Sequence, residues 1–350
     1  MLTKNKNART EEVIFPKIIG IIASKNPTSA LSQTVESLIK GGASSVVVVD
    51  DGSDDPSSFE VFERVQAMGA VVVHLKRNVG KAAALKEAFK MVPADCVIVQ
   101  TDDDTLAGNL LIPLKMLVSG KADIIDIRVE TNRTKTVIGH VQELCYWIVN
   151  VFIKRIQDLF RARLWMSGAS VMYSYRAGSV LLLKPSYTVT EDTEGLFRAR
   201  KEGMRIRSCF KKEAQFITMV PENFHDLNKQ WQRWALGNGQ VMGIYGLGGG
   251  LKRVSLMNAA WISLLILPIP LAIVNGAIRN PESLFAVSFI FGIIGAIALR
   301  RFVLVYVSVL LPFISLVWII HAVSGMFRAI RQPMSKGNAL AWVSPKRTAF

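Results

Sequence analysis

The chain has 350 residues, half of them apolar and 20% charged, a composition that excludes a disordered or collagen-like protein. Its three cysteines lack metal-ligand spacing, which indicates a reducing compartment and no zinc site. The net charge is +15, and residues 255–350 hold 8 of the 42 basic residues but 1 of the 27 acidic ones. Because these charges flank long apolar runs, we expect them to face anionic membrane lipid, and we expect no nucleic-acid partner.

A polar tail, residues 1–15, precedes a mixed segment, residues 16–254. The tail has no apolar stretch, so we expect no signal peptide and a cytosolic first domain. Apolar runs predict strands at 17–23, 45–49, 70–75 and 96–100, and helical spacing predicts helices at 28–40, 58–68 and 81–91. This alternation predicts an α/β fold with a mainly parallel sheet, in which ligands bind beyond the carboxyl ends of the strands.

The rest of the chain changes character twice. Up to residue 254, a strand is predicted at 122–129, a long helix at 141–159, a strand or turn at 165–173 and a helix at 193–201. Uncharged runs then occupy 256–278, which contains two prolines, 283–299 and 302–327. We expect two or three transmembrane helices within 255–327, followed by a basic tail, 328–350. Three spans would put that tail outside, which the positive-inside rule opposes, and two would follow if either of the first two runs does not cross.

Polar clusters follow the first predicted strands. Asp50 and Asp51 come directly after the strand at 45–49, where carboxylates accept hydrogen bonds from a base or a ribose; the alternative is an Asp-Gly turn. The segment 77–81 follows the next strand and opens a helix. Its basic side chains, Lys81 among them, and the helix N-terminus suit a diphosphate, and the alternative is a plain surface turn.

Three adjacent aspartates, Asp102 to Asp104, follow the strand at 96–100. Adjacent acids repel one another, so this placement is costly without a cation. Alternate residues of an extended segment point the same way, which would put Asp102 and Asp104 on one face. Such hard oxygen ligands suit Mg²⁺ or Mn²⁺ shared with substrate phosphates, and a solvated acidic loop is the alternative.

Two more clusters lie later in the chain. Thr190-Glu191-Asp192 precedes a predicted helix and is either a helix cap or the place of a general base. Residues 230–234 (QWQRW) place two tryptophans beside Gln230 and Arg233, close to the apolar region. Indole rings stack on sugars and Arg binds phosphate oxygens, but an interfacial amphipathic helix would show the same residues.

The order of these clusters resembles the family 2 glycosyltransferases. VVDDGSDD, RNVGK, DDDT, SGASVMY, TED and QWQRW follow one another before the apolar runs, similar to the membrane-embedded hyaluronan, chitin, poly-N-acetylglucosamine and cellulose synthases. The resemblance covers about residues 16–255, and TED followed by Q-x-x-R-W is its most specific part. It implies a GT-A nucleotide-sugar-binding domain followed by C-terminal transmembrane α-helices. The protein would be integral to the plasma or inner membrane, with the catalytic domain in the cytosol.

Carried over position by position, the resemblance implies a role for each cluster. Asp192 would be the catalytic base, and Asp104 would ligate Mg²⁺ or Mn²⁺. The UDP-sugar would be bound by Asp50, Asp51, Lys81, Asp102, Gln230 and Arg233. The acceptor would be bound by Ser167, Gly168 and Trp234.

The implied reaction is inverting transfer of a sugar from a UDP-sugar to a growing β-linked polysaccharide. UDP-GlcNAc, UDP-Glc and UDP-GlcA are the candidate donors. One alternative is transfer of a single sugar to a lipid, as in ceramide or polyprenyl-type enzymes; another is a catalytically silent scaffold, which the intact DDDT, TED and QWQRW argue against. The N-terminal spans usual in the family are absent from this sequence, so we expect a translocation channel to need a second copy, as in a homo-oligomer, or a partner.

Overall fold

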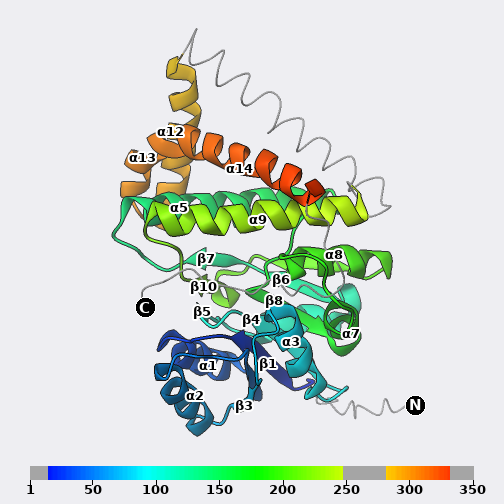
Figure 1. Cartoon of the computed structure of the whole chain (residues 1–350). Coiled ribbons are helices and arrows are strands. Elements are labelled where there is room, and N and C mark those ends of the chain that lie inside the picture. Colours follow the sequence, from blue (N-terminus) through cyan, green and yellow to red (C-terminus); the bar gives the residue numbers. More distant parts are fainter. Residues whose placement is uncertain (1–14, 247–280, 332–350) are drawn as a thin grey trace, which may run out of the picture.

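The computed structural model describes residues 15–246 and 281–331 (Figure 1). Within it, the strands predicted early in the sequence form the parallel half of a sheet. The four strands β1 (Ile18–Ser24), β2 (Ser45–Asp50), β3 (Val71–His74) and β4 (Val97–Thr101) confirm the prediction. They are parallel and form one half of a seven-stranded sheet with the order β3-β2-β1-β4-β8-β6-β9. Because they run in one direction, their carboxyl ends meet at one edge of the sheet.

The other half of the sheet contains a reversed strand. β8 (Ser170–Ser174) runs antiparallel between β4 and β6 (Ile124–Ile127), and β9 (Ile206–Cys209) is parallel to β6. The strand predicted at 122–129 is too long, because the ladder with β9 ends at β6. The chain continues as β7 (Val129–Thr131) in a second, three-stranded sheet with the order β5-β10-β7, to which β5 (Thr105–Leu106) and β10 (Phe216–Thr218) belong.

Helices cover both faces of the large sheet. α1 (Ala30–Gly41), α2 (Ser57–Ala67) and α4 (Leu111–Met116) pack on one face, and α3 (Lys81–Lys90), α7 (Tyr175–Leu182) and α8 (Glu191–Lys201) pack on the other. Side chains of β1 alternate between the two faces: Ile18 and Ile22 join the first core, and Ile19 and Ile21 join the second. Burying each such side chain stabilises the fold by about 1.5–3 kcal/mol.

Two long helical segments lie above the sheet in Figure 1. The helix predicted at 141–159 is a chain of three pieces: α5 (Val137–Trp147), a π-helical stretch at Ile148–Ile153, and α6 (Lys154–Leu159). α9 (Phe224–Tyr245) begins at Asn223, whose side chain accepts a hydrogen bond from the Asp226 amide at 2.9 Å. α9 carries residues 230–234, so the QWQRW segment is helical.

The C-terminal helices pack on this layer. They are α12 (Pro281–Leu299), α13 (Val303–Val307) and α14 (Leu311–Arg331), and α14 lies beside α9 (Figure 1). Val303–Ala329 is long and apolar enough to cross a membrane, with a mean hydropathy of 2.6, and it is the one such stretch in the described part of the chain. Ser288–Leu299 is apolar but shorter. The run predicted at 256–278 and the predicted tails lie outside the described residues, apart from residue 15 and residues 328–331.

Candidate functional site

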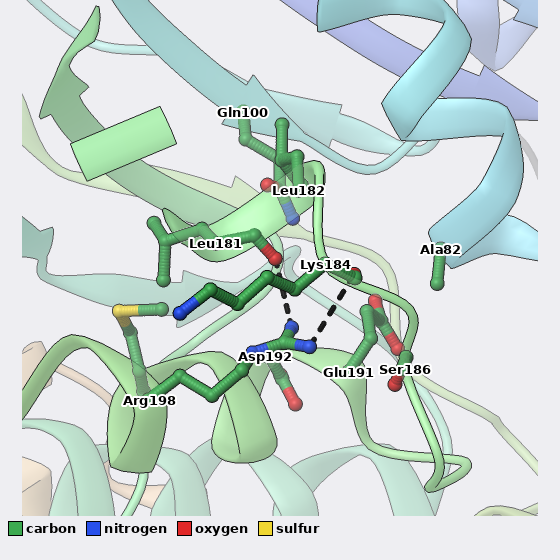
Figure 2. Close-up of a pocket in the computed structure, with 10 residues that line it drawn as sticks. Ala82, Gln100, Leu181, Leu182, Lys184, Ser186, Glu191, Asp192 and Arg198 are labelled. Carbon is green, nitrogen blue, oxygen red and sulfur yellow. Dashed lines mark hydrogen bonds between the residues drawn. The ribbon is translucent and has the colours of Figure 1, made fainter. Parts of the chain in front are cut away.

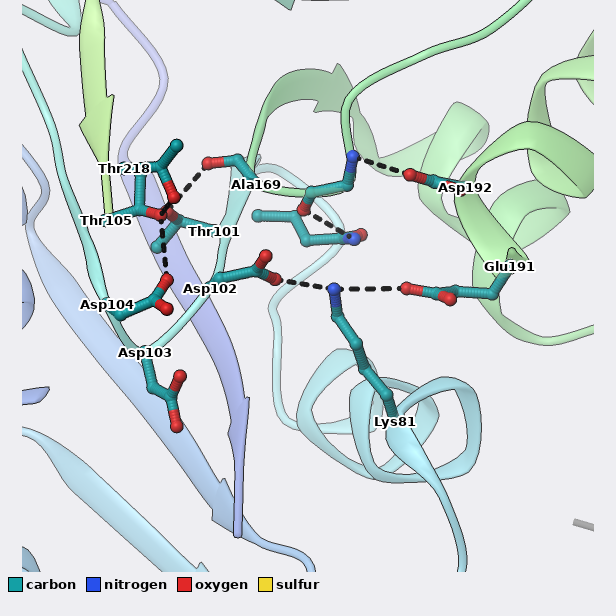
Figure 3. Close-up of polar contacts among 12 residues, drawn as sticks. Lys81, Thr101, Asp102, Asp103, Asp104, Thr105, Ala169, Glu191, Asp192 and Thr218 are labelled. Carbon is teal, nitrogen blue, oxygen red and sulfur yellow. Dashed lines mark hydrogen bonds and ion pairs between the residues drawn. The ribbon is translucent and has the colours of Figure 1, made fainter. Parts of the chain in front are cut away.

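Lys81 connects two of the predicted clusters at the carboxyl edge of the sheet. It is the first residue of α3, and its Nζ lies 2.5 Å from Asp102 Oδ1 and 3.2 Å from Glu191 Oε1 (Figure 3). Burial disfavours the charged ammonium, but Asp102 and Glu191 outweigh that effect and raise the pKa of Lys81. The side chain is therefore a permanent cation between β4 and α8.

Asp192 lies on the first turn of α8, beside Glu191. The helix predicted from residue 193 thus begins two residues earlier, at Glu191. Asp192 Oδ1 accepts a hydrogen bond from the Thr193 amide at 2.6 Å, and Oδ2 accepts one from the Gly168 amide at 2.9 Å. Burial and the Glu191 charge raise the pKa of Asp192 to about 6, against the opposing effects of Lys81 and the two amides. A carboxyl group with this pKa is suited to general base catalysis near neutral pH.

Gly168 brings the predicted acceptor segment against this base. A Cβ atom at Gly168 would lie 3.1 Å from Asp192 Oδ2 and 3.4 Å from Lys81 Nζ, so the backbone approaches closely because no side chain intervenes. Its carbonyl accepts a hydrogen bond from Gln100 Nε2 at 3.1 Å, while Ser167, one residue earlier, is half-buried. The structure thus brings Gly168, Asp192 and Lys81 together.

The two aspartates after β2 organise the neighbouring loop. Asp51 accepts hydrogen bonds from the amides of Val79 at 2.6 Å and Gly80 at 2.9 Å, and burial raises its pKa. Asp50 accepts one from the Ser53 amide at 2.8 Å and lies 2.9 Å from Nδ1 of His74. Asp50 therefore makes a turn contact of the kind that the alternative reading predicted, and Asp51 shapes the segment that leads to Lys81.

The sequence suggested an extended segment for the three consecutive aspartates, but the structure shows a turn there. β4 ends at Thr101, and residues 102–104 turn into β5. The carboxylates consequently take different partners. Asp102 contacts Lys81, and Asp104 Oδ1 accepts a hydrogen bond from the Thr105 hydroxyl at 3.3 Å (Figure 3). Asp103 Oδ2 accepts a hydrogen bond from the Ser24 hydroxyl at 2.5 Å. The turn separates the acids because like charges repel.

These acids fit a metal ion that is completed by substrate. Within residues 15–246 and 281–331 no three His, Cys, Asp or Glu side chains are arranged to hold a metal by themselves. Mg²⁺ is typically bound through one or two carboxylates together with substrate phosphates, and does not require such a cage. Asp104 is only 8% exposed and lies two residues after Asp102 in the same turn, so this donor set suits that mode of binding.

α9 contributes the last predicted residues. Gln230 is buried, and its Oε1 has no hydrogen-bond partner within the described residues. Burial and Asp102 raise the pKa of Tyr146 on α5 while Arg233 opposes the rise, so Asp102 and Arg233 act on the same hydroxyl. Trp234 packs edge-on to Trp318 of α14, with ring centroids 6.5 Å apart. α9 therefore sets Arg233 near the strand ends, whereas Trp234 contacts the C-terminal helices.

Two residues near the base were missed in the sequence. Gln100, the next-to-last residue of β4, donates to the Gly168 carbonyl and also accepts a hydrogen bond from the Tyr173 hydroxyl at 3.1 Å. Glu191 was noted only as part of TED, but it shares Lys81 with Asp102. A lone polar residue in the run CVIVQ was the available signal for Gln100.

Comparison with known proteins places this chain in a family. Residues 97–330 match the family described as glycosyl transferase family group 2, which is more than half of the chain. Poly-β-1,6-N-acetyl-D-glucosamine synthase of Staphylococcus aureus (strain COL) is 25% identical over 231 residues, 64% of this chain and 55% of that protein. The same enzyme of Staphylococcus epidermidis is 23% identical over 248 residues, 69% of this chain and 58% of that protein. The chain thus spans little more than half the length of these relatives.

A solved structure supports the fold assignment. The mannosyltransferase PcManGT from Pyrobaculum calidifontis, in complex with GDP-Man and Mn²⁺, superimposes with a TM-score of 0.59 at 15% sequence identity, covering 90% of this chain and 88% of that one. The predicted α/β GT-A fold with a mostly parallel sheet is confirmed. The chain belongs to the family 2 glycosyltransferases, and it is a glycosyltransferase.

Proposed function

We propose that this glycosyltransferase transfers a sugar from a UDP-sugar to a growing β-linked polysaccharide, with inversion at the anomeric carbon. The observation that carries the proposal is the placement of Asp192: its carboxylate contacts the Gly168 amide and stands beside the Lys81–Asp102 pair at the strand ends. One carboxylate facing the acceptor segment, with donor-binding groups next to it, suits a single displacement.

Asp192 acts as the general base. It takes the proton of the acceptor hydroxyl while the hydroxyl oxygen attacks the anomeric carbon, and UDP leaves with the electrons of the broken bond. A single displacement on an α-linked donor gives a β-linked product. The carboxyl pKa of about 6 leaves Asp192 ionised at neutral pH, ready to accept the proton.

The donor is held on the other side of Lys81. Asp50 and Asp51 bind the uridine, Lys81 and Asp102 contact the nucleotide diphosphate or sugar, and Gln230 and Arg233 on α9 hold the diphosphate. Support comes from the strand-end position of the acids and from the shared effect of Asp102 and Arg233 on Tyr146. The Arg233 guanidinium suits phosphate oxygens because its N–H groups form a fork.

Asp104 is the residue that holds Mg²⁺ or Mn²⁺, with Asp102 beside it. When bound, the cation neutralises the negative charge that develops on the leaving diphosphate. Support comes from the low exposure of Asp104, 8%, and from its position in the acidic turn that follows β4.

The acceptor and the membrane lie on the α9 side. Ser167, Gly168 and Trp234 contact the acceptor glycan, and the catalytic domain faces the cytosol from the plasma or inner membrane. Large apolar side chains are strongly exposed on the C-terminal helices, with Phe302 at 84% and Tyr306 at 78%, which favours contact with lipid. The similarity to poly-β-1,6-N-acetyl-D-glucosamine synthases favours a polysaccharide product.

The test is a donor screen with the full chain in detergent or vesicles. The protein is incubated with Mn²⁺ and UDP-GlcNAc, UDP-Glc or UDP-GlcA, singly and in pairs, with and without a chelator, and products are read by mass. A ladder of repeating sugar increments that vanishes with the chelator is the expected result. Addition of a single sugar that requires lipid would instead assign the lipid-acceptor reaction. UDP release that the chelator does not change would contradict the proposed metal dependence.

A further inference from the structure

A small cavity lies beside the proposed base. Its volume is about 20 Å³, and it is lined by residues of α3, β4, α7, α8 and the loops before β8 and α8, Asp192 and Glu191 among them (Figure 2). A polar cavity needs roughly 10–15 Å³ to hold one water molecule. The space beside Asp192 therefore suits one water, and is too small for a sugar.

Arg198 supplies a polar group that a water would satisfy. The side chain lines the cavity and is 7% exposed. Its Nη2 donates to the Leu181 carbonyl at 2.8 Å and its Nη1 to the Lys184 carbonyl at 3.4 Å (Figure 2), and Nη1 also donates to the Pro185 carbonyl at 2.7 Å. A further N–H of the guanidinium, at Nε, is buried and has no hydrogen-bond partner in the described part of the chain. Buried donors are rarely left without a partner, so this one points to a bound water.

Lys184 connects the same cavity with the surface. It lines the cavity, its side chain is 52% exposed, and its Nζ lies 2.9 Å from Glu202 Oε1. Arg198 is likewise near a carboxylate, with Nη1 3.5 Å from Glu194 Oε1. Each cation that borders the cavity is thus paired with an acid, which limits the repulsion that a passing proton would meet.

We propose that this cavity holds a single water and is the route by which Asp192 returns its proton to solvent after each transfer. The proposal rests on Asp192 being the base. In the transfer step the acceptor oxygen bonds the anomeric carbon, UDP departs with its bonding electrons, and the hydroxyl proton moves to Asp192. Asp192 then gives that proton to the cavity water, which releases a proton past Lys184, and the carboxylate is restored.

The route separates proton release from movement of the glycan. During transfer the substrate covers the acceptor face of Asp192, and a water in the cavity offers the carboxyl group a second partner for its proton. A chain-extending enzyme must restore its base at every addition, so a second route removes dependence on product movement.

The test narrows the cavity with Ala82→Val on α3. Ala82 lines the cavity, whereas the neighbouring Ala83 does not, so Ala83→Val is the matched control for a β-branched residue in this helix. UDP release is followed from mixing into the steady state, with an acceptor glycan present. We expect Ala82→Val to release UDP in a rapid first turnover, close to one per site, and then to slow about tenfold. The slow phase should recover on addition of imidazole, a small proton carrier.

The outcomes separate this proposal from the function on which it rests. Equal slowing of the first turnover and the steady state, without imidazole recovery, would show that the substitution disturbs chemistry, and would overturn the exit route. Rates equal to those of Ala83→Val would overturn it too. Full activity of Asp192→Asn would instead refute the base itself, whatever the Ala82 variant does.

Discussion

Asp192 differs from an ordinary surface aspartate because its neighbours pull its pKa in opposite directions. Burial and Glu191 raise it, and Lys81 with the amides of Thr193 and Gly168 lower it. The balance near 6 makes the carboxyl a stronger base than a free aspartate while leaving it ionised at neutral pH. Activity should therefore depend on pH, and changing one neighbour of Asp192 should shift that dependence.

Replacing Glu191 by Gln should move that dependence. The base is active above its pKa, so kcat/KM falls as the pH drops through about 6. Removing the Glu191 charge takes away a group that raises the pKa and leaves Lys81, which lowers it, so the acidic limb should shift to lower pH. The pH profile of kcat/KM measures this. Glu36→Gln, at an exposed ion pair with Lys40, is the control and should keep the original limb; an unmoved limb in Glu191→Gln would argue against Asp192 as the titrating base.

Gly168 should tolerate no side chain. An added Cβ would press on Asp192 Oδ2 at 3.1 Å, so Gly168→Ala should displace the base and lower kcat by about 100-fold while the donor KM stays nearly unchanged. Steady-state kinetics measure both constants. Gly243→Ala on α9 is the control, because its Cβ would meet nothing within 4 Å. Normal kcat in Gly168→Ala would mean that the close approach has no catalytic role.

At the level of single residues the sequence predicted where acids and cations gather, but not how they pair. Strand ends in a parallel sheet converge, which is why Lys81 and Asp102 could be expected near each other. Glu191 and Gln100 acquire their partners only through long-range packing between α8, β4 and the segment before β8. The sequence assigned Asp102 to the donor but did not show that Asp102 pairs with Lys81 or that Asp103 bonds Ser24.

At the level of elements, the parallel strands were predictable because both of their faces are buried. Such strands are continuous apolar runs, as in SVVVV. The failures have a common cause: β5, β7 and β10 are two or three residues long, too short for any periodicity to reveal. The break between β6 and β7 and the turn at 102–104 both arise where the chain leaves the large sheet for the small one.

The contact between α9 and α14 depends on glycine. A Cβ at Gly325 would lie 2.5 Å from the backbone carbon of Ala235, so Gly325→Ala must push the helices apart. We expect a loss of about 1–3 kcal/mol in unfolding free energy and lower activity, because α9 carries Arg233. Thermal melting in detergent measures the loss of stability. Gly243→Ala, again the control, should stabilise by about 0.5–1 kcal/mol, since Ala is the better helix former; equal melting of the two variants would contradict the close packing.

At the level of the whole molecule, an α/β GT-A domain and an apolar helical layer share one interface. α5 and α9 form a layer over the strand ends, and α12, α13 and α14 pack on the side of this layer that faces away from the sheet (Figure 1). Composition predicted this division, because charge and apolar residues are segregated along the chain. The composition did not predict the number of membrane spans, since hydropathy alone does not say which apolar runs cross the bilayer.

The full chain should behave as an integral membrane protein. Val303–Ala329 extends about 40 Å as a helix, more than the roughly 30 Å hydrocarbon core. We expect the protein to stay in the membrane fraction after washes with high salt and then alkaline carbonate. Release by salt would mean that basic residues alone hold it to anionic lipid, and release by carbonate alone would mean peripheral apolar attachment.

The most direct measurement compares Asp192→Asn with the unaltered chain in two assays on one preparation. Sugar transfer should fall about 1,000-fold, because the amide cannot take the acceptor proton. UDP with Mn²⁺ should still raise the melting temperature, equivalent to about 2.7 kcal/mol at a UDP concentration 100 times its Kd in both proteins. Loss of transfer with intact UDP binding is the predicted result. Retained transfer, or loss of UDP binding in a folded variant, would contradict Asp192 as the base of a UDP-sugar transferase.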